Sequence, residues 1–139
     1  MNTQTSILLI DDDLMVRQAL SQALAVENYH VVPAANRQEA LREFTNHPID
    51  IVLLDVNPRN ENGWETARRF TALRPHLVVI GMTARPEQQV SSSIALAVDA
   101  LLEKPINLYV LIHTLDQLCS HNPEPRRCGF SQPQLALQR

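Results

Sequence analysis

Four short apolar runs, each ending at a polar side chain, constrain the fold of this chain most strongly. The runs are rich in Val, Ile and Leu, and they end at Asp11-Asp12, Asp55, Thr83 and Lys104. Such runs are typical of strands that are buried on both faces of a parallel sheet. Ligands of open α/β sheets bind outside the carboxyl ends of the strands. The sequence therefore predicts carboxylates, a hydroxyl and an ammonium group at one edge of a sheet.

Strand-like and helix-like segments alternate along the chain, which predicts a doubly wound α/β domain with five strands and five helices. Asn36 with Glu39, and Asn62 with Glu65, have the spacing of a capping box at the start of a helix. The expected helices run over about 14–26, from Asn36, from Asn62, from Pro86 and from about Asn107. Leu73 is expected on the apolar face of the third helix, and Leu108 on that of the fifth.

The second predicted strand, near His30 to Ala35, contains Pro33. Proline cannot donate a hydrogen bond to a sheet ladder, so this strand is expected at an edge of the sheet. It is also the one predicted strand that does not end at an acidic, hydroxyl or cationic side chain. Both features fit a parallel sheet of strand order 2-1-3-4-5.

The composition limits the class of protein. The 139 residues suffice for one domain with its own core, and the formal charge of −3 argues against a nucleic-acid surface. Cys119 and Cys128 form no disulfide framework and are expected to be reduced thiols. Neither a signal peptide nor a membrane span is recognisable, so we expect a cytoplasmic protein. The folded domain is expected over 1–120, and 121–139 is expected to be a flexible tail.

The polar residues at the strand ends suggest phosphoryl chemistry. Asp11, Asp12 and Asp55 would raise one another's pKa unless a cation lay between them. Mg²⁺ prefers oxygen ligands, binds through one or two carboxylates and also binds phosphate. Lys104 can bind a phosphoryl group as a point charge, Thr83 can donate a hydrogen bond to it, and a carboxylate can act as the nucleophile.

The order and spacing of these residues resemble the receiver domain of two-component response regulators, the CheY-like superfamily. The resemblance covers roughly residues 6–119 and implies a flavodoxin-like fold. The motifs that carry it are Asp11-Asp12 with Arg17, Asp55 with Gly63 eight residues later, Thr83-Ala84 and Lys104-Pro105.

The resemblance implies a role for each residue of the site. Asp55 is the phospho-acceptor, and Thr83 and Lys104 contact the phosphoryl group. Asp12 and Asp55 ligate Mg²⁺ directly, Asp11 acts largely through water, and the main-chain carbonyl of Asn57 supplies another ligand. The peptide bond between Lys104 and Pro105 is expected to be cis.

The chain departs from the family pattern at three positions. Leu101 stands where the family usually has Tyr or Phe. The aromatic side chain that reports phosphorylation to the outer face in the family is therefore missing here. Arg59 replaces a proline after the acceptor, and Ala97 replaces a glycine before the fifth strand. Arg85, together with Asn57, occupies a position that tunes hydrolysis of the aspartyl phosphate in the family.

The resemblance implies a signalling switch that is not an enzyme beyond phosphorylating and dephosphorylating itself at Asp55. A histidine kinase or a histidine phosphotransfer protein would donate the phosphoryl group and dock on the first helix. Phosphorylation would then bias a protein-binding surface around the fourth helix, with a phosphorylation-dependent dimer as one outcome. Neither nucleic acid nor membrane is expected as a direct partner.

Two alternative functions fit parts of the pattern. Leu101 and the unusual Pro58-Arg59 loop would suit an interaction module that works without phosphorylation. Asp11-x-Asp13, Thr83 and Lys104 follow the motif order of a haloacid-dehalogenase-like phosphatase. That family needs a further acidic pair after the lysine, and the only acidic residues there are Asp116 and Glu124.

Overall fold

A five-stranded parallel sheet forms the centre of the molecule, with strand order β2-β1-β3-β4-β5. The structure is a computed structural model that describes residues 4–58, 62–84 and 98–119. The strands are β1 (Ser6–Ile10), β2 (His30–Ala34), β3 (Ile51–Asp55), β4 (Val78–Thr83) and β5 (Ala100–Glu103). The helices are α1 (Leu14–Val26), α2 (Arg37–Asn46), α3 (Gly63–Leu73) and α5 (Leu108–Cys119). The predicted fold class and strand order are confirmed.

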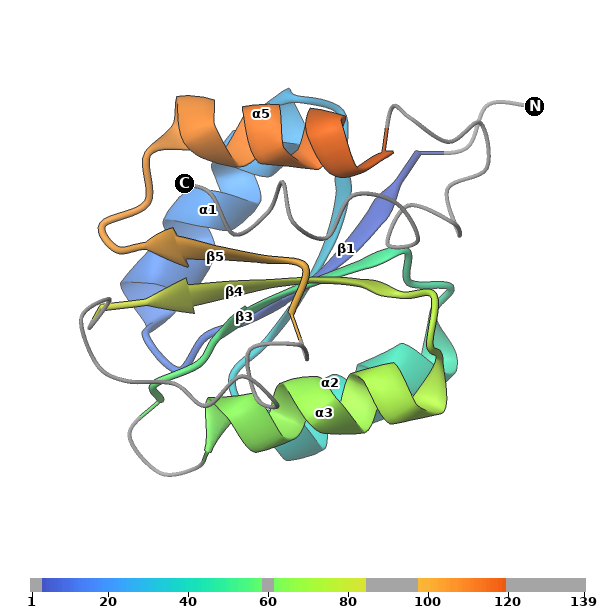
Figure 1. The fold of residues 1–139 in the computed structure, drawn as a ribbon. Coiled ribbons are helices and arrows are strands. Elements are labelled where there is room, and N and C mark those ends of the chain that lie inside the picture. The colour runs from blue at the N-terminus through green and yellow to red at the C-terminus, as the bar shows by residue number, and fades with distance from the viewer. Residues whose placement is uncertain (1–3, 59–61, 85–97, 120–139) are drawn as a thin grey trace.

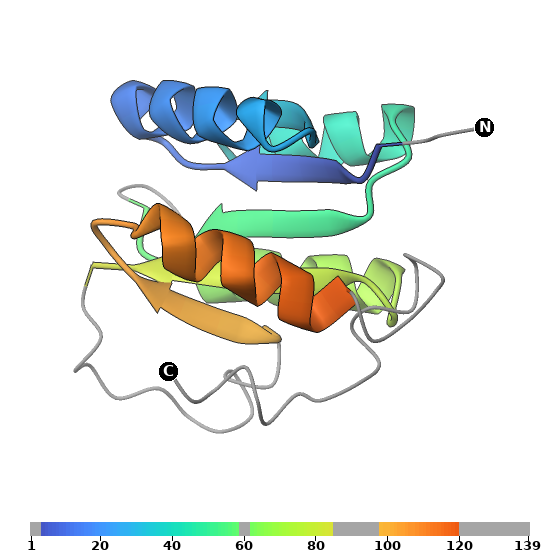
Figure 2. The same ribbon diagram turned by 90° about the horizontal axis from the view of Figure 1, so that it is seen from above.

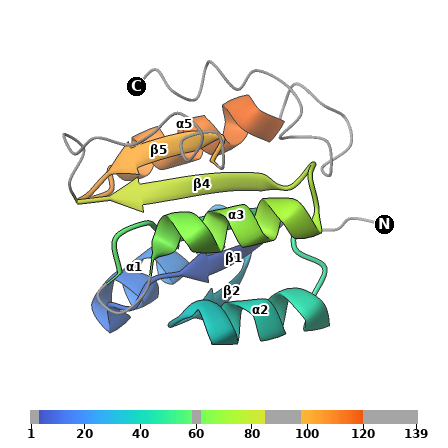
Figure 3. The ribbon, with the colours of Figure 1, turned by 60° about the horizontal axis from the view of Figure 1, so that its bottom comes forward.

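Helices cover both faces of the sheet. Helices α1 and α5 lie on one face and α2 and α3 on the other, so the molecule has three layers (Figures 1 and 2). Figure 3 shows α2 and α3 side by side across the second face. Alternate residues of β1 serve the two cores: Ile7 and Leu9 pack in the α1 and α5 core, and Leu8 and Ile10 in the α2 and α3 core. This two-sided burial explains why the central strands are continuously apolar.

The capping residues begin the helices where the sequence predicts. The Asp13 carboxylate accepts hydrogen bonds from the backbone N–H groups of Met15 and Val16 at the start of α1. The Asn36 and Asn62 side chains each accept one from a glutamate N–H three residues later, at the starts of α2 and α3. These bonds satisfy donors that have no partner within the helix.

Two residues of the predicted apolar helix faces lie at the surface instead. Leu73, the last residue of α3, is 60% exposed, and Leu108, the first residue of α5, is 40% exposed. Both lie at helix ends, where the chain is turning away from the sheet. The helical period alone does not indicate where a helix leaves the core.

Strand β2 lies at the edge of the sheet, as Pro33 predicts, and pairs only with β1 among the described strands. None of the helices in the described ranges is long and apolar enough to cross a bilayer. Several predictions fall outside the described residues and stay predictions. These are the helix from Pro86, the role of Arg85, the departures at Arg59 and Ala97, and the tail over 121–139.

Hydrogen bonds between Asp99 and Val79 hold the start of β5 beside β4. They lie at the end of the sheet opposite the strand ends that are followed by the polar residues. The Asp99 carboxylate Oδ2 accepts a hydrogen bond from Val79 N at 2.8 Å, and the Asp99 N–H donates to Val79 O at 2.6 Å. Burial raises the pKa of Asp99 to about 6, although the bond from Val79 N opposes this shift.

The raised pKa of Asp99 predicts a pH-dependent stability. The folded protein holds this proton more tightly than the unfolded chain, so stability falls as pH rises from about 4 to about 6. Above this window the loss is complete and amounts to about 2 to 3 kcal/mol. Asp99→Asn keeps an acceptor for Val79 N and removes the charge. We expect a shallower pH slope in urea unfolding and a variant that is more stable than the wild type at pH 7. Equal slopes for the two proteins would contradict this prediction.

Candidate functional site

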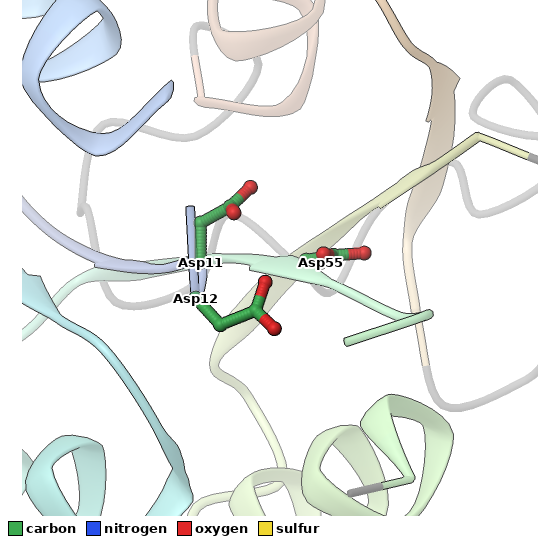
Figure 4. Close-up of side chains that lie close together, drawn as sticks. All are labelled: Asp11, Asp12 and Asp55. Atoms are coloured by element: carbon green, nitrogen blue, oxygen red, sulfur yellow. The ribbon is translucent and has the colours of Figure 1, made fainter. Parts of the chain in front are cut away.

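The carboxylates of Asp11, Asp12 and Asp55 meet at the carboxyl edge of the sheet. Strands β1 and β3 are neighbours, and Ile10 pairs with Leu54, so Asp11 and Asp55 follow at adjacent positions. One oxygen from each of the three side chains lies within 4.8 Å of the others. Figure 4 shows Asp11 and Asp12 leaving the end of β1 beside Asp55 at the end of β3. The structure thus brings together the acidic residues that the sequence predicts at one site.

Asp11 is the most buried of the three carboxylates, with 1% of the residue exposed. Its Oδ1 accepts a hydrogen bond from Asp13 N at 2.9 Å, and its Oδ2 lies 2.8 Å from Lys104 Nζ. Burial raises the pKa of Asp11 despite the nearby lysine and the bond from Asp13 N. Arg17 donates through Nη1 to the main-chain carbonyl of Asp11 at 2.8 Å and so supports the loop between β1 and α1.

Lys104 is the cation of the site among the described residues. Its Nζ lies 2.8 Å from Asp11 Oδ2 and 3.3 Å from Asp55 Oδ2. Burial would lower the pKa of Lys104, but the hydrogen bonds and negative charges of Asp11 and Asp55 outweigh it, and the pKa is raised. Lys104 therefore stays charged at neutral pH. The peptide bond from Lys104 to Pro105 is cis, as expected.

Asp55 and Thr83 are linked through Asn57. The backbone N–H of Asn57 donates to Asp55 Oδ1 at 2.8 Å, and the Thr83 hydroxyl donates to Asn57 Oδ1 at 2.6 Å. Asp55 and Thr83 are both buried, and Asn57 is half-buried. Thr83 therefore lies at the same edge of the sheet as the carboxylates, at the end of the strand next to β3.

Sequence reasoning missed two contacts around the site. One is the hydrogen bond from Thr83 to Asn57. The other is a link between the starts of α2 and α3, in which Arg37 Nε donates to Thr66 Oγ1 at 3.0 Å. Thr66 also lines a small pocket beside Asp12 and Asp55. No motif indicated either contact, because both join side chains far apart in the sequence.

The charges at this edge fit a divalent cation. Among the described residues, the cluster holds three carboxylates and one lysine, which leaves two negative charges when all four groups are ionised. Carboxylate oxygens at this spacing match the oxygen ligands that Mg²⁺ takes in proteins. Asp13 is excluded from this set, because its carboxylate caps α1 and the residue is exposed. Asp116 is also exposed, on α5, so neither residue serves the phosphatase alternative.

Curated relatives include both regulators and kinases of two-component systems. Response regulator RR06 of Streptococcus pneumoniae is 28% identical over 113 residues, which cover 81% of this chain and 52% of that protein. Sensor histidine kinase RcsC of Escherichia coli K12 is 33% identical over 115 residues, or 82% of this chain and 12% of that protein. The chain thus spans about half of the first relative and a small part of the second.

Solved receiver structures share the fold. The response regulator TrrA of Thermotoga maritima, in complex with Mg²⁺-BeF, has a TM-score of 0.74 and 27% identity. The similarity covers 81% of this chain and 97% of TrrA. A CheY-like receiver domain from Methanospirillum hungatei has a TM-score of 0.72 and 26% identity, over 82% of this chain and 92% of its own.

The sequence profile of the response regulator receiver domain matches residues 7–116 of this chain. Of the described strands, this span contains β2 to β5 and all of β1 except Ser6, and it contains the acidic cluster. Receiver domains are signalling domains of two-component systems and occur in response regulators and in sensor kinases. The chain belongs to the response regulator receiver domain family.

Proposed function

We propose that Asp55 accepts a phosphoryl group from a phosphohistidine donor in a Mg²⁺-dependent reaction, and that phosphorylation switches a protein-binding surface. The observation that carries this proposal is the position of the Asp55 carboxylate. It lies among the other carboxylates, with Lys104 Nζ 3.3 Å from Oδ2 and the Asn57 N–H on Oδ1. A nucleophile, a fixed cation and oxygen ligands for a metal are therefore within reach of one another.

Each residue of the site has its own role in the proposed phosphoryl transfer. An Asp55 oxygen attacks phosphorus, the bond from phosphorus to the donor nitrogen breaks, and an aspartyl phosphate forms. Lys104 supplies positive charge to the phosphoryl oxygens, and Thr83 donates a hydrogen bond to one of them. Asp12, Asp55 and the Asn57 carbonyl would hold Mg²⁺, with Asp11 acting through water. When bound, Mg²⁺ neutralises charge on the transferring group.

The donor that fits this chemistry is a histidine kinase or a histidine phosphotransfer protein. Support comes from a co-crystal structure of the histidine phosphotransfer protein Ypd1 of Saccharomyces cerevisiae with the receiver domain of Ssk1. That structure is similar to this chain in fold, with a TM-score of 0.71 and 18% identity. The start of α1 offers a docking surface beside the acidic cluster, because Leu14 is 54% and Met15 74% exposed. Both partners would meet in the cytoplasm. In this proposal the domain acts as an acceptor, and its chemistry is phosphorylation and dephosphorylation of itself at Asp55.

Trp64 provides a test of this function. It follows Gly63, whose backbone packs against Val56 and the carbonyl of Asp55, so its fluorescence should report on the site. We expect a saturable change with Mg²⁺ and a further change when beryllofluoride, a phosphoryl mimic, is added. Asp12→Asn is expected to weaken Mg²⁺ binding about tenfold or more. The exposed Asp116→Asn on α5 is the control and should bind like the wild type.

The same titration separates the proposed function from the alternative interaction module. A phospho-acceptor responds to beryllofluoride only in the presence of Mg²⁺. A wild-type protein that responds to neither Mg²⁺ nor beryllofluoride would favour a module that works without phosphorylation.

A further inference from the structure

The side chain of Asn57 connects the proposed phospho-acceptor with the hydroxyl of Thr83. Its Oδ1 accepts the Thr83 hydroxyl at 2.6 Å, a short and well-formed bond. Its backbone N–H donates to Asp55 Oδ1 at 2.8 Å. Thr83 is only 4% exposed, so water competes little for its hydroxyl. In the unphosphorylated protein, the bond to Asn57 therefore helps to orient the Thr83 hydroxyl.

The backbone on either side of this contact is held by neighbouring strands. Thr83 O accepts a hydrogen bond from Lys104 N at 2.8 Å, and Met82 O accepts one from Val56 N at 2.9 Å. These bonds hold the end of β4 between the ends of β3 and β5. A change in the direction of the Thr83 hydroxyl thus requires mainly a rotation of its side chain between staggered conformers.

Asn57 and a phosphoryl group on Asp55 would compete for the same donor. A threonine hydroxyl carries one proton and donates it to one acceptor at a time. A charged phosphoryl oxygen is a stronger acceptor than a neutral amide oxygen. Phosphorylation would therefore draw the hydroxyl away from Asn57, and the half-buried amide oxygen would then be hydrated.

We propose that the hydrogen bond between Thr83 and Asn57 Oδ1 is a latch that holds Thr83 in its resting direction and opposes the phosphorylated state. Asn57 is then a positioning residue that acts through Thr83, in addition to any role of its main-chain carbonyl. The inference depends on the proposed phosphorylation of Asp55. Breaking the bond between Thr83 and Asn57 costs free energy, and this cost reduces the net free energy of phosphoryl binding.

Asn57→Ala removes the latch and leaves the main-chain carbonyl in place. Because a neutral hydrogen bond contributes modestly to stability, we expect beryllofluoride to bind about two- to tenfold more tightly to this variant at saturating Mg²⁺. In a Thr83→Val background, where no hydroxyl is present, the same substitution is expected to leave beryllofluoride affinity unchanged. A metal-binding or purely structural role of the Asn57 side chain would change the affinity equally in both backgrounds.

The experiment is a double-mutant cycle that follows Trp64 fluorescence during beryllofluoride titration. It uses the wild type, Asn57→Ala, Thr83→Val and the double variant. Asn57→Leu, which keeps the volume of the side chain, replaces Asn57→Ala should the latter fail to fold. If Thr83→Val abolishes binding, a second measurement tests the latch: the NMR methyl resonance of Thr83 in the Asn57→Ala variant without beryllofluoride. We expect this resonance to shift toward the position that it has in the wild type with beryllofluoride bound.

The outcomes distinguish the latch from the proposed function. If the wild type does not bind beryllofluoride, the proposed function fails and the latch fails with it. If the wild type binds, but Asn57→Ala has equal effects in both backgrounds or weakens binding, the latch is wrong and the phospho-acceptor stands. An unmoved Thr83 methyl resonance would likewise overturn the latch alone.

Discussion

Asp55→Asn is expected to abolish phosphoryl labelling of this protein by acetyl phosphate and Mg²⁺. An amide lacks the nucleophilic carboxylate oxygen that forms the aspartyl phosphate, so no residual rate is expected at this position. The wild type should gain one phosphoryl group, detected as a mass increase of the intact protein. The labelling should disappear when Mg²⁺ is removed with a chelator.

The substitution should leave the fold intact, so that loss of labelling reports chemistry. An asparagine oxygen can still accept the hydrogen bond that Asp55 Oδ1 receives from Asn57 N. Removal of one of three neighbouring negative charges relieves repulsion in the metal-free protein. We therefore expect the variant to unfold at the same temperature as the wild type or at a higher one.

Asp50→Asn is the matched control, because Asp50 precedes β3 at the opposite end from Asp55. Its carboxylate accepts a hydrogen bond from Ser6 N at 2.9 Å, and asparagine can accept the same bond. This variant should be labelled like the wild type. Equal labelling of Asp55→Asn would show that another residue is the acceptor.

Gly63→Ala is expected to destabilise the protein by about 3 kcal/mol. An added Cβ would lie 2.3 Å from Val56 Cα and 2.5 Å from the carbonyl oxygen of Asp55, and both are backbone atoms. Neither the start of α3 nor the strand end can move aside without disturbing the acidic cluster. Alanine is otherwise favoured in a helix, so a net loss must come from this overlap.

Gly81→Ala provides a matched comparison in β4. There the added Cβ would lie 3.0 Å from Val56 Cγ1 and 3.1 Å from Leu101 Cδ1, which are the ends of side chains. These can shift by a few tenths of an ångström, so we expect a loss of about 1 kcal/mol or less. Urea unfolding of both variants measures the difference. A loss for Gly63→Ala no larger than that for Gly81→Ala would contradict the close packing between α3 and the strand end.

The sequence allowed the fold to be predicted because local signals agreed with one another. The continuous apolar strands required cover on both faces, Pro33 required an edge strand, and Asp13, Asn36 and Asn62 marked where helices begin. Leu73 and Leu108 were wrongly expected in the core, because burial at a helix end depends on where the chain leaves the sheet.

The site was predictable only at the level of which residues gather there. Strand ends identify Asp11, Asp12, Asp55, Thr83 and Lys104 without reference to side-chain conformation. The hydrogen bond from Thr83 to Asn57 was not predictable, since it depends on the conformation of a loop and on two side-chain rotamers. The link from Arg37 to Thr66 was hidden for the same reason: it joins two helix starts that only the folded sheet brings together.

We propose that this edge of the sheet presents Asp55 for phosphorylation in the presence of Mg²⁺. The most direct measurement is peptide mapping by mass spectrometry after the wild-type protein reacts with acetyl phosphate and Mg²⁺ and the acyl phosphate is trapped by borohydride reduction. We expect a single modified residue, Asp55, and no modification in the absence of Mg²⁺. Modification at another aspartate, or none at all in a protein that binds Mg²⁺, would contradict it.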